Sequence, residues 1–301
     1  MQISPKKILF MGLGGSGKSS IRSVVFDGKK PKEVQSYEAT INYTRSTTSF
    51  IDDAIQIFDC GGQEAYLNNF VGKQAEFIFS YANTLIWVVD VGKFDHLSSS
   101  KFYFDQAVKN MLKYSPEGEI HCFFHKMDLI LPHMKTEVIK NLKQYFTTRL
   151  SAEIQCHSTS IFDASIFTAI GEIIRKIIAS SSKTQTVTEA IKEYVKEGQD
   201  LSGIVVYSAE GLPVFEEGNM TDKTILPANL WLVISDKIDR SFGKQETFKS
   251  MLETDEYIFL FQRMKNEWFL AGIAKKKAER QYVMIKMDQL SEVVNRLISE
   301  V

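Results

Sequence analysis

The chain has 301 residues, of which 44% are hydrophobic and 24% charged, and its formal net charge is -1. This length is enough for two domains, and the apolar fraction excludes a mostly disordered chain. A near-zero charge argues against a dedicated nucleic-acid-binding protein, which usually carries a large basic excess. With only six prolines and 17 glycines, collagen-like and low-complexity architectures are excluded as well.

The cysteines and histidines do not follow the spacing of a disulfide framework or a metal site. The three cysteines, Cys60, Cys122 and Cys156, include no CxxC pair, which favours a reducing compartment. The five histidines lack HExxH spacing, so a metalloprotease has no support.

The N-terminus does not have the pattern of a signal peptide. The apolar run Ile8–Met11 is too short and is interrupted by Gly12–Lys18. No stretch reaches the roughly 18–20 apolar residues that cross a bilayer, and the ends lack the myristoylation and prenylation motifs. We therefore expect a soluble cytoplasmic protein whose recruitment to a membrane surface, if it occurs, depends on partners.

The first half alternates short apolar runs with helical patterns. Strands are expected at Lys6–Met11, Tyr43–Ile51, Ala54–Asp59, Thr84–Asp90, Ile120–His125 and Ile154–Ser158. Helices are expected at Lys18–Asp27, Ser99–Tyr114, Lys135–Leu150 and Ile166–Ile178. This alternation predicts an α/β domain with a mostly parallel sheet and helices on both faces. The small, polar stretch Ala179–Thr184 is the best linker candidate, so we place the domains at 1–180 and 181–301.

The second half begins a new pattern of helices and strands. Its expected elements are a helix at Val187–Glu197, strands at Gly203–Tyr207 and Leu212–Phe215, a helix at Pro227–Arg240, strands near Glu246–Leu252, Tyr257–Arg263 and Trp268–Ile273, and a helix at Asp288–Ile298. The order αββαβββα predicts a layered module with an antiparallel sheet. The basic run Lys275–Lys277 is interpreted as a solvated loop rather than a membrane contact.

The segment Gly12–Ser19 fits the pattern G-x-x-x-x-G-K-[ST], between an apolar strand and a helix. Its glycines let backbone N–H groups surround phosphate oxygens, and the helix N-terminus adds partial positive charge. The lysine reaches the β- and γ-phosphates, and the serine hydroxyl ligates Mg²⁺. A glycine-rich turn without a ligand is the alternative. We assign nucleotide contacts to Gly14, Gly15, Ser16, Gly17, Lys18, Ser19 and Ser20.

A second motif, Asp59–Glu64, follows the strand Ala54–Asp59. An Asp at the end of a strand beside a phosphate loop can hold Mg²⁺ through water. The backbone N–H of Gly62 is placed to meet the γ-phosphate, and Gln63 to orient the attacking water. An ordinary Gly-Gly turn is the alternative interpretation.

The residues His125–Asp128 end another strand. A carboxylate at Asp128 can accept two hydrogen bonds from guanine, whereas adenine offers no such pair of donors. The stem of Lys126 can cover the face of the base. Ser160 and Ile161, after the strand Ile154–Ser158, are expected to donate backbone N–H groups to the base. Surface residues in ordinary loops are the alternative for both segments.

Together, these motifs resemble the small GTPases of the Ras superfamily. The sequences DCGGQ at 59–63, HKMDL at 125–129 and TSI at 159–161 resemble the Rag/Gtr family in particular, over roughly residues 6–180. The resemblance implies that His125 takes the place of the commoner Asn in the nucleotide site. It also implies that Thr40 is the switch I threonine and that Ser19, Thr40 and Asp59 hold Mg²⁺. Glu38 rather than Arg precedes Thr40 by two residues, so no arginine finger in cis is evident and hydrolysis is expected to be slow without a partner.

The second half resembles a roadblock domain, most clearly at Leu201–Phe215. That resemblance implies dimerisation with itself, or with another Rag-like or roadblock protein, through the helix Pro227–Arg240 and the adjacent edge strand Glu246–Leu252. We therefore expect a GTP-hydrolysing switch that uses GTP, GDP and Mg²⁺ and responds to a GTPase-activating protein and an exchange factor. A catalytically idle, nucleotide-bound scaffold is the alternative. An ATP-using kinase or ATPase is disfavoured by Asp128.

Overall fold

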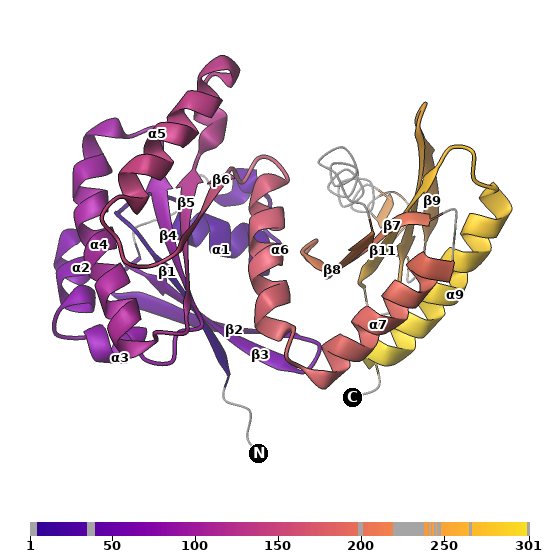
Figure 1. The fold of residues 1–301 in the computed structure, drawn as a ribbon, viewed down its shortest axis with the longest axis horizontal. Coiled ribbons are helices and arrows are strands. Elements are labelled where there is room, and N and C mark those ends of the chain that lie inside the picture. Colours follow the sequence, from indigo (N-terminus) through magenta and orange to yellow (C-terminus); the bar gives the residue numbers. More distant parts are fainter. Residues whose placement is uncertain are drawn as a thin grey trace. The chain divides into compact units, whose positions relative to one another are not determined.

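A six-stranded sheet with the order β2-β3-β1-β4-β5-β6 forms the centre of the first half of the chain (Figure 1). Its strands are β1 (Lys6–Met11), β2 (Tyr43–Phe50), β3 (Asp53–Cys60), β4 (Thr84–Asp90), β5 (Glu119–His125) and β6 (Ile154–Thr159). Neighbours pair in parallel except β2, which is antiparallel to β3. The mostly parallel α/β sheet expected from the sequence is confirmed.

The structure is a computed structural model that describes residues 5–34, 40–197, 201–218, 238–239, 241, 243, 245, 248–264 and 267–299. The chain divides into two units, Met1–Ala169 and Ile170–Val301. Two expectations lie outside the described residues: Glu38, and the helix Pro227–Arg240 except for two positions. Within the described ranges, no helix is both long and apolar enough to cross a bilayer.

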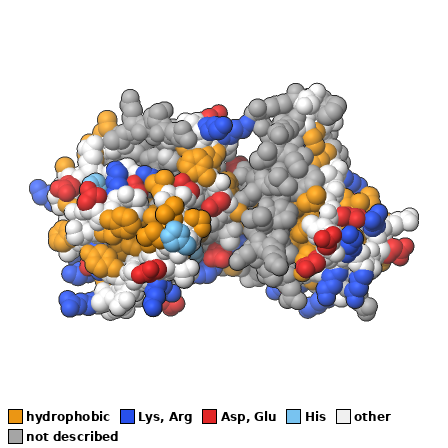
Figure 2. Space-filling model, turned by 90° about the horizontal axis from the view of Figure 1, so that it is seen from above, with side chains coloured by type: hydrophobic (Ala, Val, Ile, Leu, Met, Phe, Trp, Pro, Cys, Tyr) orange, Lys and Arg blue, Asp and Glu red, His pale blue; other side chains and the backbone are white. Residues whose placement is uncertain are grey.

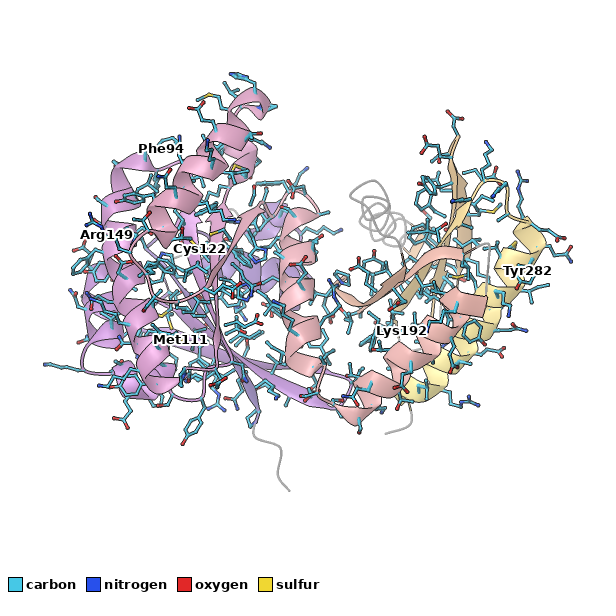
Figure 3. All side chains as sticks on the ribbon, viewed as in Figure 1. Phe94, Met111, Cys122, Arg149, Lys192 and Tyr282 are labelled. Atoms are coloured by element: carbon cyan, nitrogen blue, oxygen red, sulfur yellow. The ribbon has the colours of Figure 1, made fainter. Side chains whose placement is uncertain are left out.

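The helices of the first half are α1 (Lys18–Phe26), α2 (Glu64–Val71), α3 (Ala75–Phe79), α4 (Leu97–Tyr114), α5 (Lys135–Thr147) and α6 (Ser165–Ile178). Helices α2 and α3 were not expected from the sequence. The centre of the sheet is buried because β4 is apolar between its terminal Thr84 and Asp90. Trp87, in the middle of β4, is fully buried, and its indole N–H donates to Ser100 Oγ on α4 over 3.0 Å. Met111 and Cys122 lie inside this unit, whereas Phe94 and Arg149 lie on its outside (Figure 3).

The second unit contains a five-stranded antiparallel sheet with the order β8-β7-β11-β10-β9 (Figure 1). Its strands are β7 (Leu201–Tyr207), β8 (Pro213–Gly218), β9 (Lys249–Glu253), β10 (Tyr257–Arg263) and β11 (Phe269–Lys275). Helices α7 (Ser182–Glu197) and α9 (Arg280–Ser299) pack side by side against it. The Met287 side chain of α9 packs directly on Gly272, because a Cβ there would lie 2.3 Å from Met287 Sδ. The expected antiparallel sheet is confirmed.

The segment between the two sheets differs from the expectation. Helix α7 begins at Ser182, so only residues 179–181 separate it from α6, and Thr184 is 95% buried rather than part of a linker. By its internal contacts the chain divides at 169/170, inside α6, and the domain bounds 1–180 and 181–301 stay a prediction. The C-terminal part of α6 belongs to the second unit because Arg175 donates to Pro213 O over 2.8 Å and pairs with Glu216 at 3.2 Å.

Two further boundaries are corrected. Helix α9 begins at Arg280, eight residues before the expected Asp288, and β9 ends one residue later than expected. Lys275 is the last residue of β11, and Lys276 and Lys277 follow it before α9. All three are exposed to solvent, as the sequence predicted, although Lys275 belongs to the strand rather than to a loop.

Candidate nucleotide-binding site

A cavity of 420 Å³ opens where the loops after β1, β3, β5 and β6 meet, at the carboxyl ends of these strands. Thirteen residues assigned from the sequence line it: Gly14, Gly15, Gly17, Lys18, Ser19, Ser20, Thr40, Gly62, Gln63, His125, Lys126, Asp128 and Ile161. Ser16, Asp59 and Ser160 lie behind this lining, almost fully buried. The structure therefore brings together motifs that are far apart in the sequence.

The phosphate loop follows β1 and ends at Gly17, which precedes α1 with a φ of 105° that favours glycine. Lys18 is almost fully buried, and its ammonium donates to the carbonyl oxygens of Gly12 and Leu13, each over 2.9 Å. Burial lowers the pKa of Lys18 to about 8, and the nearby Asp59 carboxylate opposes this shift. The loop therefore holds a cation next to backbone amides that can receive phosphate oxygens.

The three expected metal ligands form one cluster. Ser19 Oγ and Thr40 Oγ1 lie 2.8 Å apart, which is close to the separation of about 2.9 Å between neighbouring ligands of octahedral Mg²⁺. Asp59 is 1% exposed, and its Oδ1 has no hydrogen-bond partner among the described residues. Burial raises the pKa of Asp59, while a hydrogen bond from Ser19 works against this shift. A buried carboxylate with one unpartnered oxygen, beside two hydroxyls, fits a divalent cation.

The loop after β3 lies directly on the phosphate loop. A Cβ at Gly62 would come within 2.4 Å of the carbonyl carbon of Leu13 and 2.5 Å of the nitrogen of Gly14. Only glycine allows this approach, so the backbone of Gly62 faces the phosphate loop. Gln63 follows at the start of α2 and is exposed at the rim of the cavity.

The loop after β5 is fixed to the phosphate loop by two contacts. The buried His125 ring lies against Gly17, and its Nδ1 is 3.0 Å from Thr159 Oγ1 on β6. Burial lowers the pKa of His125 to about 4, aided by the Lys126 charge. Lys126 Nζ donates to Gly15 O over 2.8 Å and pairs with Asp90 at 2.7 Å. A neutral histidine therefore fills the place of the commoner Asn.

Ser160 takes a different position from the one expected. Its N–H donates to Ser165 Oγ over 2.9 Å, so it is not directed at the cavity. Its hydroxyl donates to Asp128 Oδ1 over 2.5 Å and accepts the N–H of Phe162 over 3.1 Å. Ser160 therefore orients the carboxylate of Asp128 instead of contacting a base.

Three lining residues were not assigned to the site from the sequence: Val34, Leu129, which is the last residue of the motif HKMDL, and Phe162. Leu129 and Phe162 are 61% and 56% exposed, and each directly follows a motif, HKMD or TSI. Apolar side chains gather on this face of the first unit (Figure 2). An apolar residue immediately after a base-recognition motif is the signal that would have identified both.

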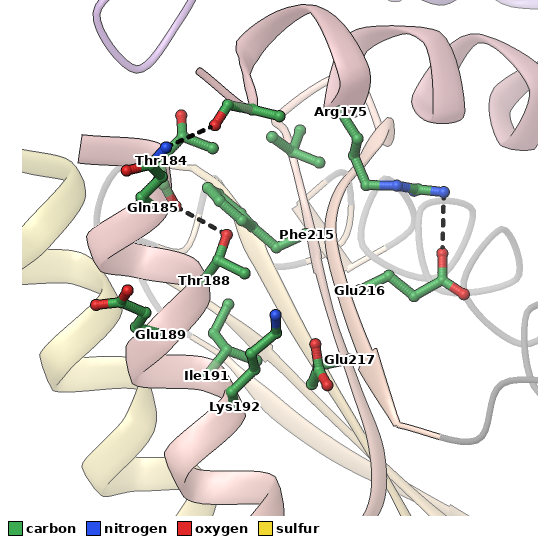
Figure 4. Close-up of a pocket in the computed structure, with 12 residues that line it drawn as sticks. Arg175, Thr184, Gln185, Thr188, Glu189, Ile191, Lys192, Phe215, Glu216 and Glu217 are labelled. Atoms are coloured by element: carbon green, nitrogen blue, oxygen red, sulfur yellow. Dashed lines mark hydrogen bonds and ion pairs between the residues drawn. The ribbon is translucent and has the colours of Figure 1, made fainter. Parts of the chain in front are cut away.

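A second cavity, of 310 Å³, lies within the second unit (Figure 4). Residues from the end of α6, from α7 and from β8 line it, among them Arg175, Lys192 and Glu217. It contains no phosphate loop and none of the residues assigned from the sequence. It therefore does not compete with the first cavity as the nucleotide site.

Comparison with known proteins agrees with this geometry. The family model described as the Gtr1/RagA G protein conserved region matches residues 7–223. The GTP-binding protein gtr1 of Schizosaccharomyces pombe is 32% identical over 196 residues, covering 64% of this chain and 62% of that protein. GTR1 of Saccharomyces cerevisiae is 33% identical over 193 residues, covering 62% of each chain.

The Ras-related GTP-binding protein B of Rattus norvegicus is 28% identical over 227 residues, covering 65% of this chain and 60% of that protein. The matched part thus spans 60–62% of the length of these three relatives. Because the family model covers most of the chain and its motifs meet in one cavity, the chain belongs to the Gtr1/RagA family of G proteins.

Proposed function

We propose that this chain binds GTP and GDP with Mg²⁺ in the cavity at the ends of β1, β3, β5 and β6, and hydrolyses GTP as a conformational switch. The observation that carries the proposal is the meeting of the phosphate loop, Gly62, Gln63 and Asp128 around one 420 Å³ cavity. A phosphate site and a carboxylate that accepts hydrogen bonds, both lining one cavity, match the two ends of a guanine nucleotide.

In this proposal each element has a separate task. The backbone amides of the phosphate loop and the Lys18 ammonium bind the phosphates, and Asp128, oriented by Ser160, accepts hydrogen bonds from the guanine edge. Ser19, Thr40 and Asp59 would hold Mg²⁺, which when bound neutralises charge on the β- and γ-phosphates. The Gly62 N–H donates to a γ-phosphate oxygen, and Gln63 orients the attacking water.

The proposed conformational switch depends on the contacts that require the γ-phosphate. Thr40 and Gly62 lie on the loops before β2 and after β3, and both line the cavity. When the γ-phosphate leaves, these loops lose a ligand and the surfaces that they present change. No arginine is evident in cis, so we propose that an activating protein accelerates hydrolysis and an exchange factor releases GDP.

Base selectivity tests the proposed site. Wild-type protein should bind GDP far more tightly than ADP, and Asp128→Asn should shift the preference toward xanthine nucleotides, whose 2-oxo group requires a donor. Equal affinity of the wild type for ADP and GDP would refute the proposal. A protein that binds GDP but never turns over GTP, even with cell extract, would instead be the idle scaffold.

We further propose that the second unit dimerises through the edge of its sheet. Strand β9 is an edge strand of the described sheet, and Met251 in its centre is 42% exposed. An exposed edge with apolar side chains favours pairing with another strand. Light scattering of the full-length chain at high micromolar concentration should report a dimer. A monomer would rule out self-association and leave a second Rag-like chain as the partner.

A further inference from the structure

Lys93 lies beside the phosphate loop although no motif includes it. Strand β4 pairs with β1 in the sheet, so the loops that follow these two strands emerge next to each other (Figure 1). Three hydrogen bonds from backbone N–H groups hold the loop after β4. Val91 N–H donates to His125 O over 3.0 Å, Gly92 N–H to Asp90 Oδ1 over 2.9 Å, and Lys93 N–H to Asp90 O over 3.2 Å. The backbone of Lys93 is therefore fixed relative to the phosphate loop.

The Lys93 side chain reaches the centre of that loop. A Cβ built on Gly15 would lie 3.5 Å from Lys93 Nζ, and apart from Gly15 and its two chain neighbours no other described residue comes within 4 Å of that point. Gly15 has a φ of 74°, and its carbonyl oxygen already accepts a hydrogen bond from Lys126. Two ammonium groups therefore converge on one glycine of the phosphate loop.

Only one of these two charges is neutralised. Lys126 forms an ion pair with Asp90 at 2.7 Å. Lys93 is exposed and, within the ranges that the structure describes, its ammonium group makes neither a hydrogen bond nor an ion pair. An uncompensated cation beside backbone amides that receive phosphate oxygens attracts an anion to that point.

We propose that Lys93 is an additional phosphate-binding residue that contacts the β-phosphate of the bound nucleotide. This inference rests on the proposed function. The β-phosphate is favoured over the γ-phosphate because the Lys93 ammonium approaches Gly15, one residue beyond the Leu13–Gly14 pair that Gly62 contacts, and Gly62 meets the γ-phosphate in that proposal. Lys93 also lines a small pocket beside Gly14 and Ser16, so it lies along the phosphate loop and not only at Gly15. GDP and GTP share the β-phosphate, so Lys93 strengthens the binding of both and has no part in the hydrolysis step.

The test compares Lys93→Gln with Lys140→Gln, which removes an exposed lysine from α5 away from the cavity. Dissociation constants for GDP and a non-hydrolysable GTP analogue are measured at 50 and 200 mM salt, together with the turnover of bound GTP. Lys93→Gln should weaken both nucleotides about fivefold at low salt and less at high salt, with turnover unchanged. Lys93→Arg should retain wild-type affinity, and Lys140→Gln should have no effect.

Three results would overturn the inference. Equal affinities for Lys93→Gln and Lys140→Gln would remove Lys93 from the site. Weakened GTP analogue binding with unchanged GDP binding would place the contact on the γ-phosphate. Reduced turnover at unchanged affinity would make Lys93 a hydrolysis residue. If wild-type protein binds no guanine nucleotide, the proposed function fails, and this inference fails with it. Thermal unfolding of each variant confirms that it is folded.

Discussion

The imidazole ring of His125 lies so close to Gly17 that a Cβ on the glycine would be 2.7 Å from His125 Cδ2. The contact joins the base-recognition loop to the end of the phosphate loop without a hydrogen bond to the glycine. Because the ring is 1% exposed and next to the Lys126 charge, protonation is disfavoured. A residue that is a pH sensor in many proteins is here a neutral spacer.

This neutrality predicts a pH dependence of stability. The pKa of His125 is about 4 in the folded chain, against about 6.5 when it is unfolded. Between these pH values the unfolded state binds a proton that the native state does not. The contribution of neutral His125 to the free energy of unfolding is therefore fully present above pH 6.5. It is lost as the pH decreases toward 4, by about 3 kcal/mol in total. Urea unfolding of the wild type and of His125→Asn from pH 4.5 to 8 should diverge below pH 6.5. Parallel curves would show that His125 is not the group responsible.

The Ser160–Asp128 hydrogen bond predicts a second effect. Ser160→Ala removes the donor that orients the carboxylate, so affinity for GDP should fall about fivefold, which corresponds to the net contribution of about 1 kcal/mol of a typical hydrogen bond. Ser98→Ala, on an exposed position of α4, is the matched control. Titration with a fluorescent GDP analogue measures both. An unchanged dissociation constant would mean that Asp128 keeps its position without Ser160.

Gln63 is expected to act in hydrolysis alone. Gln63→Leu retains a similar volume but cannot orient water, so single-turnover GTP hydrolysis should slow at least about tenfold while GDP affinity is unchanged. Asn69→Leu, an exposed position on α2, controls for placing a leucine on this helix. Wild-type turnover in Gln63→Leu would exclude Gln63 from the mechanism.

Removal of Mg²⁺ should distinguish the metal ligands from the other contacts. Ser19 Oγ lies 2.8 Å from Thr40 Oγ1 and beside the unpaired Asp59 Oδ1, so Ser19→Asn should weaken GTP binding more than GDP binding. EDTA should accelerate nucleotide release from the wild type and have much less effect on the variant. Equal sensitivity of both proteins to EDTA would contradict this metal site.

Packing in the second unit gives a prediction on stability. Gly272→Ala places a methyl group 2.3 Å from Met287 Sδ, and because the flexible end of Met287 can move aside, the free energy of unfolding should fall by only about 1 kcal/mol. Adding Met287→Ala makes room for that methyl group. The free energy of unfolding of the double variant should therefore fall by less than the sum of the decreases in the two single variants. Chemical denaturation of all four chains measures the coupling. Strict additivity would indicate that α9 moves away from β11 instead.

The sequence predicts most of the first unit because its strands are continuous apolar runs and its loops carry motifs of fixed spacing. It misses α2 and α3, which have eight and five residues and are too short to show a periodic apolar face. The supposed linker is a helix start: Ser181 Oγ accepts the N–H of Thr184 over 3.2 Å, so the polar residues are a cap rather than a flexible stretch.

The remaining errors concern contacts between distant residues. The hydroxyl of Ser160 meets Asp128 across 32 positions of sequence, and Lys93 meets Gly15 only because β4 is the neighbour of β1. Neither relationship leaves a local pattern in the sequence. The strand order of the sheet has to be known before either contact can be inferred.

Helix α6 limits how the chain can be dissected. The helix runs from Ser165 to Ile178 without interruption, while the two units meet at 169/170. A cut at residue 180 is the natural choice for isolating a C-terminal fragment. It would separate Arg175 from Pro213 O and remove Gly171, against which Pro213 packs. A fragment that keeps this packing must begin before Gly171 and therefore carries the C-terminal part of α6 with it.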